Sequence, residues 1–259
     1  MGSALFDLTG KIALITGSSK GIGRAIAEEM ARAGASVVIS SRKADICEGV
    51  AAAINAELAD QPGAAIAIPA HIGDKAALER LVEQARQQLG AIDILVCNAA
   101  VNPFYGASKD IPDSAFQKVL NVNIQSNHWL CHMVLPEMVE RQAGAIIIVS
   151  SIGGLRGSVD LGAYAISKAA DIQMVRNFAA EYGPDNIRVN AISPGLVRTD
   201  FARALWENPE NLARRTANDP LRRIGEPEEI AGAAVFLASP AGRFMTGQNI
   251  VIDGGATCV

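Results

Sequence analysis

Apolar and polar positions along the chain follow two alternating patterns. Short runs rich in Val, Ile and Leu are followed by longer Ala-rich stretches in which apolar residues recur at helical spacing. The short runs predict strands over 11–16, 36–41, 65–70, 92–97, 145–150, 187–192 and 249–252. The longer stretches predict helices over 21–33, 44–58, 74–89, 113–140, 162–182 and 226–238.

The predicted strands are apolar almost throughout, which is typical of strands that are buried on both faces. Together with the strand–helix alternation, this predicts an α/β fold: a single doubly wound, Rossmann-type domain over residues 1–259, with a seven-stranded parallel sheet and helices on both faces. No internal repeat or flexible linker divides the chain. The segment 194–220 is long for a loop and carries Phe201, Leu205 and Trp206, so we expect a substrate lid there. Alternatively, it covers the core or a subunit contact.

Composition argues against several kinds of binding partner and indicates the cellular compartment of the protein. The chain has 27 acidic and 23 basic side chains, so it lacks the strong positive charge that favours nucleic acid or an anionic membrane. Its longest apolar run, 233–238, is far shorter than the ~18 residues of a membrane helix. The N-terminal residues have no basic segment with a long apolar core, and the four cysteines form no C-x-x-C pair. We therefore expect a cytoplasmic protein whose cysteines are packing residues.

Several of the 24 glycines cluster directly after the first predicted strand, where Gly17, Gly21 and Gly23 precede a helix. Such a turn lets the backbone approach a ligand, and the helix N-terminus favours a pyrophosphate. The predicted binding residues of this turn are Gly17, Ser19, Lys20, Gly21, Ile22 and Gly23. The same residues match the G-x-S-x-G motif of α/β-hydrolases, but that mechanism needs a late histidine and the last one here is His132.

The end of the second predicted strand indicates which dinucleotide is bound. An acidic residue at this place selects NAD, whereas the chain has Ser41 and Arg42. The Arg42 guanidinium can pair with a 2′-phosphate, and Lys20 adds a second cation. We therefore predict NADP(H) as the cofactor.

Two Y-x-x-x-K segments are candidates for proton transfer. Tyr105–Lys109 lies among Pro and Gly residues in a predicted loop, whereas Tyr164 and Lys168 share one face of a predicted helix. A phenol with a pKa of ~10 is a poor acid at neutral pH, and an adjacent ammonium stabilises its phenolate. Ser151, thirteen residues before Tyr164, is placed to hydrogen-bond a substrate oxygen.

The spacing T-G-x-x-x-G-x-G, together with the order Asn123, Ser151, Tyr164 and Lys168, resembles the short-chain dehydrogenase/reductase family. The resemblance implies that Asn123 holds a helix kink and a water that relays protons to Lys168. It also implies that Asn98, Ala99 and Ala100 lie near the adenine ribose. Further cofactor contacts that it implies are Ile72 and, in place of the family's usual Asp, His71, with Pro194, Gly195, Val197 and Thr199 near the nicotinamide.

Two shorter segments, 98–106 and 203–206, are similar to NADPH-dependent carbonyl reductases of the dehydrogenase/reductase type. This similarity implies a ketone or aldehyde substrate, with Phe104, Leu155, Phe201 and Trp206 as pocket walls. The resemblance further implies a homotetramer built through 113–140 and 162–182. His128 and His132 have a metal-like spacing, but Trp129 replaces the glutamate of H-E-x-x-H and no third ligand is evident, so we predict no metal.

The sequence therefore predicts an NADP(H)-dependent oxidoreductase that acts on a carbonyl/alcohol pair, with Tyr164 as general acid/base. Two alternatives are a 3-oxoacyl thioester reductase and a nucleotide-sensing regulator with the same fold. The absence of a residue from the tetrad Asn123, Ser151, Tyr164 and Lys168 would favour the regulator, and all four residues are present.

Overall fold

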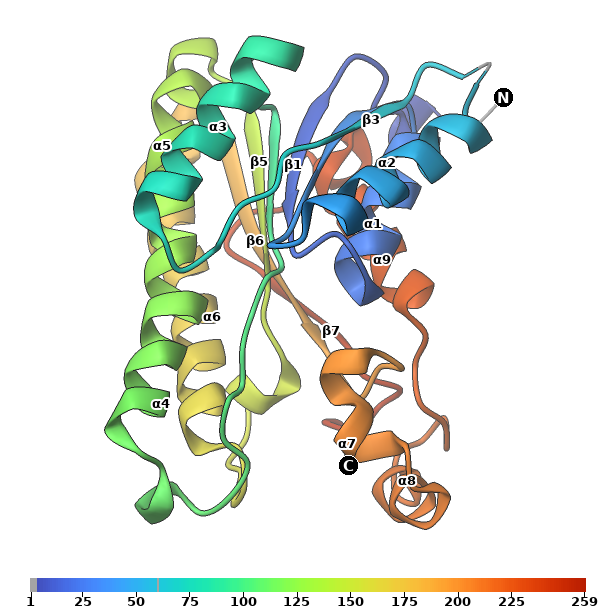
Figure 1. Cartoon of the computed structure of the whole chain (residues 1–259), viewed down its shortest axis with the longest axis vertical. Helices are drawn as coiled ribbons and strands as arrows, with labels where there is room; N and C mark the ends of the chain where they lie inside the picture. The colour runs from blue at the N-terminus through green and yellow to red at the C-terminus, as the bar shows by residue number, and fades with distance from the viewer. Residues whose placement is uncertain (1–3, 60) are drawn as a thin grey trace.

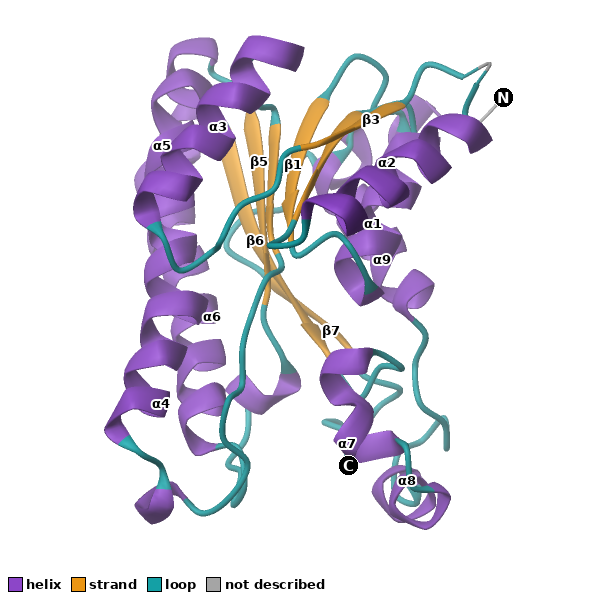
Figure 2. Ribbon diagram, in the orientation of Figure 1, coloured by secondary structure: helices purple, strands orange, loops and turns teal. Residues whose placement is uncertain are grey.

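A seven-stranded, entirely parallel sheet runs through the middle of the computed structural model, which describes residues 4–59 and 61–259. The strands are orange in Figure 2 and lie in the order β3-β2-β1-β4-β5-β6-β7. Their bounds are β1 Ile12–Thr16, β2 Ser36–Ser40, β3 Ala64–Ala67, β4 Ile94–Cys97, β5 Gly144–Val149, β6 Ile187–Pro194 and β7 Asn249–Ile252. The predicted α/β fold with a seven-stranded parallel sheet is confirmed.

Helices cover both faces of the sheet (Figure 1). Their bounds are α1 Gly21–Arg32, α2 Ala44–Glu57, α3 Lys75–Leu89, α4 Asp113–Val119, α5 Ser126–Arg141, α6 Gly162–Tyr182, α7 Arg203–Trp206, α8 Pro209–Thr216 and α9 Pro227–Ala238. One apolar core joins α1, α2 and α9 to the sheet, and a second joins α3, α5 and α6 to its other face. Because both faces are covered, the strands alternate between two apolar environments, which explains their unbroken hydrophobic runs.

The order of the strands reverses direction between β1 and β4. From β1 the chain builds outward to β2 and β3, and it then crosses back to place β4 on the other side of β1. In a doubly wound sheet, the loops that leave two such strands diverge and open a crevice at their carboxyl ends. The fold thus dictates where a ligand site can form before any side chain is considered.

The predicted helix over 113–140 is interrupted. Between α4 and α5 the residues Leu120–Gln125 form a π-helical segment, η3. The Asn123 side chain accepts a hydrogen bond from the Val101 backbone N–H (2.8 Å) and donates one to the Val101 carbonyl (3.0 Å). These bonds fix the widened turn against the loop after β4, a type of irregularity that is frequent at functional sites.

Strand β6 extends two residues beyond its predicted end. Pro194, the first residue of the segment 194–220, is therefore the last residue of β6. It then forms the 3₁₀ turn η6, Asp200–Ala202, followed by α7 and α8. Figure 1 shows α7 and α8 beyond the carboxyl end of β7.

Within the described ranges, no helix is both long and apolar enough to span a membrane. The expectation about the N-terminal segment rests partly on residues 1–3, which lie outside the described residues. Cys47, Cys97 and Cys131 are buried, as expected of packing residues, whereas Cys258 is exposed, so the packing interpretation was wrong for it.

Candidate active site

A cleft of about 1220 Å³ lies at the carboxyl ends of the strands. It brings together residues from turns that are far apart in the sequence, including every residue that was predicted to contact the cofactor. These residues are Gly17, Ser19, Lys20, Gly21, Ile22, Gly23, Ser41, Arg42, His71, Ile72, Asn98, Ala99, Ala100, Tyr164, Lys168, Pro194, Gly195, Val197 and Thr199. Ser151 also lines the cleft, whereas Asn123 is fully buried behind it.

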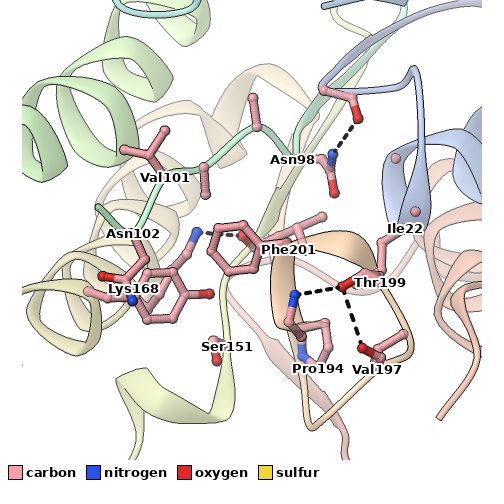
Figure 3. Close-up of a pocket in the computed structure, with 18 of the residues that line it drawn as sticks. Ile22, Asn98, Val101, Asn102, Ser151, Lys168, Pro194, Val197, Thr199 and Phe201 are labelled. Atoms are coloured by element: carbon pink, nitrogen blue, oxygen red, sulfur yellow. Dashed lines mark hydrogen bonds between the residues drawn. The ribbon is translucent and has the colours of Figure 1, made fainter. Parts of the chain in front are cut away.

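The glycine-rich turn is fastened to the end of β4 by Asn98. Its amide nitrogen Nδ2 donates to the Thr16 carbonyl (2.9 Å) and to the Gly17 carbonyl (3.2 Å), a contact visible in Figure 3. Gly17 has a φ of 66°, which is a left-handed conformation that glycine adopts without strain. A Cβ on Gly23 would collide with Asn98 Nδ2 and lie 2.5 Å from the Gly17 carbonyl oxygen. Glycine is therefore required at position 23 by this packing.

The N-terminus of α1 faces the cleft. Lys20 is its N-cap residue and makes no side-chain capping bond, while Gly21, Ile22 and Gly23 of the first turn all line the cleft. The first backbone N–H groups of a helix have no partner inside the helix, so this end favours an anion. The Lys20 ammonium itself pairs with Asp200 of η6 at 3.1 Å, and both side chains are exposed.

Arg42 is the second residue beyond the end of β2, is exposed and lines the same cleft. Among the described residues it forms no ion pair, so its guanidinium is available to a ligand. Ser41 beside it is held by a contact of 3.2 Å between its Oγ and the Cys47 Sγ. After β3, His71 Nδ1 accepts from the Gly73 N–H at 3.2 Å, which orients the imidazole at the edge of the cleft.

Ser151, Tyr164 and Lys168 meet on the opposite wall of the cleft. Ser151 follows β5 and accepts from the Gly153 N–H (3.0 Å), which leaves its own hydroxyl hydrogen for another acceptor. Tyr164 and Lys168 lie one helical turn apart on α6, and the lysine Nζ is 5.8 Å from the centre of the tyrosine ring. In Figure 3, Ser151 and Lys168 stand across the cleft from Ile22 and Thr199.

The loop after β6 closes the cleft on the side of α1. A Cβ on Gly195 would lie 2.7 Å from the Cα of Asp253, so this position admits no side chain. Thr199 Oγ1 donates to the Val197 carbonyl (3.4 Å) and accepts from the Ala202 N–H (3.3 Å). These bonds begin η6 and fix the direction in which the segment 194–220 leaves the sheet.

Two contacts tie this segment to the far wall. The Phe201 ring lies 5.8 Å from the Tyr164 ring, centre to centre. On α8, the Arg215 guanidinium donates to the Tyr105 hydroxyl (3.0 Å), which in turn donates to Asp160 (3.1 Å). Tyr105 lies in a loop, as predicted from its sequence context.

Of the four side chains expected to wall the substrate pocket, Phe201 lines the cleft and Phe104, Leu155 and Trp206 are not among its lining residues. Trp206 instead donates its indole N–H to the Thr199 carbonyl at 2.9 Å and lies under the Arg198 guanidinium. It is therefore part of the internal structure of this segment.

Several residues at the site carry no local motif and were missed from the sequence. Ser150 donates its hydroxyl to the Lys168 carbonyl (2.7 Å), which anchors α6 to the end of β5. Asp171, one turn beyond Lys168, forms an ion pair with it at 2.9 Å, and Asn127 of α5 contacts Asp171. An acidic residue at i+3 from the lysine of Y-x-x-x-K was the one available signal for this pair.

Comparison with known proteins shows the family to which the chain belongs. The family model described as Enoyl-(Acyl carrier protein) reductase matches residues 17–257. The chain is 41% identical over 249 residues to Dehydrogenase/reductase SDR family member 4 of Bos taurus, which covers 96% of this chain and 88% of that protein. The chain therefore belongs to the short-chain dehydrogenase/reductase family.

Solved structures of other dehydrogenases resemble this short-chain dehydrogenase/reductase over nearly its whole length. A gluconate 5-dehydrogenase from Burkholderia cenocepacia, in complex with NADP and tartrate, is 29% identical with a TM-score of 0.93, and the match covers 99% of this chain and 98% of that one. A 7α-hydroxysteroid dehydrogenase complexed with NADH and 7-oxo glycochenodeoxycholic acid is 37% identical with a TM-score of 0.90, over 98% and 97% of the two chains.

The packing of Gly23 against Asn98 predicts that alanine at two helical glycines, Gly23 and Gly232, changes the stability of the protein in opposite directions. We expect Gly23→Ala to destabilise the protein by about 1–3 kcal/mol, since the new methyl group overpacks a rigid backbone contact. Gly232→Ala in α9 is the matched control, because its Cβ meets nothing within 4 Å, and alanine should stabilise this helix by up to about 1 kcal/mol. Urea unfolding of both variants measures the difference, and equal stabilities would contradict the proposed packing.

Proposed function

We propose that this short-chain dehydrogenase/reductase is an NADP(H)-dependent enzyme that interconverts a carbonyl compound and its alcohol. The observation that carries the proposal is the single cleft lined by the glycine-rich turn, Arg42, and the group Ser151, Tyr164 and Lys168. The solved relative that binds NADP and the one that binds NADH support a nicotinamide cofactor. The tetrad, in its expected order, supports an enzyme over a regulator.

The residues of the cleft fit a nicotinamide dinucleotide. The uncapped N-terminus of α1 and the glycine-rich turn, which leaves no room for a Cβ at Gly23, suit a diphosphate. Arg42 suits a 2′-phosphate, and the three residues directly after β2, 41–43, include no acidic side chain to repel it. Lys20 pairs with the exposed Asp200, and its ammonium has two further N–H groups for a phosphate. When bound, the nicotinamide supplies a hydride to the carbonyl carbon or accepts one from the alcohol carbon.

The protein supplies the proton and the charge stabilisation. During reduction, Tyr164 donates its phenolic proton to the substrate oxygen, and the Lys168 ammonium stabilises the phenolate that remains. Ser151 donates its hydroxyl hydrogen to the same substrate oxygen and stabilises the charge that develops there. Asn123 acts at a distance by fixing the π-helical segment against Val101. In the oxidation direction, the Tyr164 phenolate takes the proton from the alcohol.

The function is tested by measuring NADPH oxidation and NADP reduction against a panel of ketones, aldehydes, polyols and acyl thioesters, with NADH and NAD in parallel. We expect turnover of ketones or aldehydes that carry apolar groups, since Ile152, Leu205 and Phe201 line the cleft. A clear preference for polyols would reject this substrate class. A preference for acyl thioesters would favour the thioester reductase, in line with the description of the matching family model.

Replacing the proposed acid/base tests its role. Tyr164→Phe keeps the ring and its contact with Phe201 but removes the ionisable proton. We expect kcat to fall by roughly 10²–10⁴, the usual contribution of general acid/base catalysis. Binding of NADPH, followed by its fluorescence, should stay within about twofold. Turnover within tenfold of the wild type would refute the role.

The choice of cofactor depends on Arg42. We expect Arg42→Ala to raise the Kd of NADPH by roughly 10- to 100-fold, because a charged hydrogen bond contributes about 1.5–3 kcal/mol. The Kd of NADH should change little, since it has no 2′-phosphate. Lys11→Ala is the control for net charge, since Lys11 precedes β1 at the opposite end of the strand. Equal weakening of both cofactors would exclude a 2′-phosphate site at Arg42.

We also propose that the segment 194–220 is a lid held by the Arg215–Tyr105–Asp160 contact. Tyr105→Phe removes the bridging hydroxyl, and losing about 1 kcal/mol of hydrogen bonding should make the opening of α8 about fivefold more favourable. Trypsin cleavage after Arg214 or Arg215, with the fragments identified by mass, measures the opening. Tyr182→Phe, the same chemical change at the end of α6, is the control. Equal cleavage of both variants would contradict the proposal that the Arg215–Tyr105–Asp160 contact holds the lid.

A further inference from the structure

An ion pair with almost no access to water lies on α6 behind the cleft. Lys168 and Asp171 are 2% and 0% exposed, and the lysine Nζ is 2.9 Å from Asp171 Oδ2. A buried ion pair contributes little to stability, because removing two charges from water offsets their attraction. Replacing a buried ion pair with apolar side chains of similar volume often costs no stability, so stability alone does not account for this carboxylate.

The Asp171 carboxylate is held from a second helix. Asn127 on α5 uses its Nδ2 to donate to Asp171 Oδ1 (3.0 Å) and to the main-chain carbonyl of Asn123 (2.8 Å). Both partners are acceptors, so the amide can present only its nitrogen to them. Its Oδ1 has no hydrogen-bond partner within the described residues. The Asn127 amide therefore gives the Asp171 carboxylate a hydrogen bond, while its own buried carbonyl oxygen has none from the described part of the chain.

The same pair fixes the direction of the lysine. Lys168 Nζ donates to the Val149 carbonyl (2.8 Å) as well as to Asp171, and an ammonium has three N–H groups in a tetrahedral arrangement. Two bonds to rigid partners set the direction of the third N–H. Lys168 lines the cleft and lies beside Tyr164. The third N–H of its ammonium is therefore available on the wall of the cleft that carries Tyr164, the proposed acid/base.

The charged state of Lys168 depends on few groups. Burial acts to lower the pKa of Lys168, but attraction by Asp171 and Tyr164 and the hydrogen bond to Asp171 outweigh it, so the pKa is raised. Burial raises the pKa of the Asp171 carboxyl, against the effects of Lys168 and Asn127, so both groups of the pair retain protons to higher pH. Cys97 of β4 also faces the pair; its contact with Cys131 of α5 and its burial raise the pKa of its thiol, which keeps it neutral.

We propose that Asp171 is a positioning residue that holds the Lys168 ammonium charged and aimed at Tyr164. The hydrogen bonds from Lys168 through Asp171 and Asn127 to the Asn123 carbonyl make the connection with side chains where the family resemblance implies a water. The inference rests on the proposed roles of Tyr164 and Lys168.

Removing the carboxylate should change the order in which protons leave the site. Burial without a counter-charge can lower the pKa of a lysine by about 3–5. In Asp171→Asn the lysine would therefore lose its proton before Tyr164 ionises, and the phenolate would form without an adjacent cation. Tyr164 should then ionise at higher pH than in the wild type. If Lys168 stayed charged without Asp171, the loss of a nearby negative charge would shift this ionisation to lower pH instead.

The test is a titration of the ligand-free protein, followed by phenolate absorbance. Subtracting the titration of the same background carrying Tyr164→Phe isolates Tyr164 from Tyr105 and Tyr182. In Asp171→Asn we expect the Tyr164 midpoint to rise by about one pH unit or more. At neutral pH, kcat for alcohol oxidation should fall about tenfold, the effect of one pH unit on the phenolate fraction. KM should stay within about threefold. An unchanged or lowered midpoint would overturn the proposal.

Two further variants separate charge from packing. Asp171→Glu restores the carboxylate, so its midpoint should return toward the wild-type value, and a shift as large as that of Asp171→Asn would overturn the proposal. Ser239→Ala removes a buried hydrogen bond at the end of α9 and should leave the Tyr164 titration unchanged. If Asp171→Asn does not fold, Asn127→Ala provides the test: it leaves both charges but frees the carboxylate, and the midpoint should rise by a smaller amount. No rise would refute the role of Asp171.

The titration requires neither substrate nor cofactor, so its result is separate from the proposed activity. A wild-type protein that turns over none of the carbonyl panel would count against the proposed function, while a raised midpoint in Asp171→Asn would still support the coupling between Asp171 and Tyr164. Normal turnover with an unmoved midpoint would reject the role of Asp171 and leave the proposed function standing.

Discussion

The contact between Asn98 and the glycine-rich turn is the constraint on which the cleft depends. The loops that leave β1 and β4, the two strands at the reversal of the sheet, diverge, and the Asn98 side chain joins them by donating to the carbonyls of Thr16 and Gly17. Thr16 completes the link, since its hydroxyl oxygen accepts from the backbone N–H groups of Asn98 and Ala99. Because these distances are fixed, α1 must begin close to β4, and its N-terminus opens into the cleft.

The opposite wall is built from polar groups buried behind the apolar sheet. Ser150, Asn123, Asn127 and Asp171 are each at most 3% exposed, and each is hydrogen-bonded to a neighbouring helix, strand or loop. Such groups are costly to bury unless they are paired, so their bonds allow few alternative arrangements. The geometry of Tyr164 and Lys168 is therefore held by long-range bonds, which an isolated α6 would lack.

The segment 194–220 is held by weaker interactions than either wall. It contacts the glycine-rich turn through the exposed Lys20–Asp200 pair, and the far wall through the Phe201 ring and the exposed Arg215–Tyr105–Asp160 contact. An exposed ion pair contributes about 0–1 kcal/mol, so the Lys20–Asp200 pair adds little to what holds this segment in place. This contrast supports the proposed lid, because the hydrogen bonds that hold Lys168 lie outside the segment 194–220.

The sequence by itself determined the sheet, its helices and the candidate residues that carry a local motif. Apolar periodicity identifies strands and helices, and the turn at Gly17 or the pair Tyr164 and Lys168 can be recognised because its members are close in the chain. The π-helical break at Asn123 and the partners of Asp171 were decided by tertiary structure. Asn127 and Asp171 are 44 positions apart, and Arg215 and Tyr105 are 110 apart. No periodic pattern records such pairs, because only the packing of α5 on α6 and of α8 across the cleft brings them within hydrogen-bonding distance.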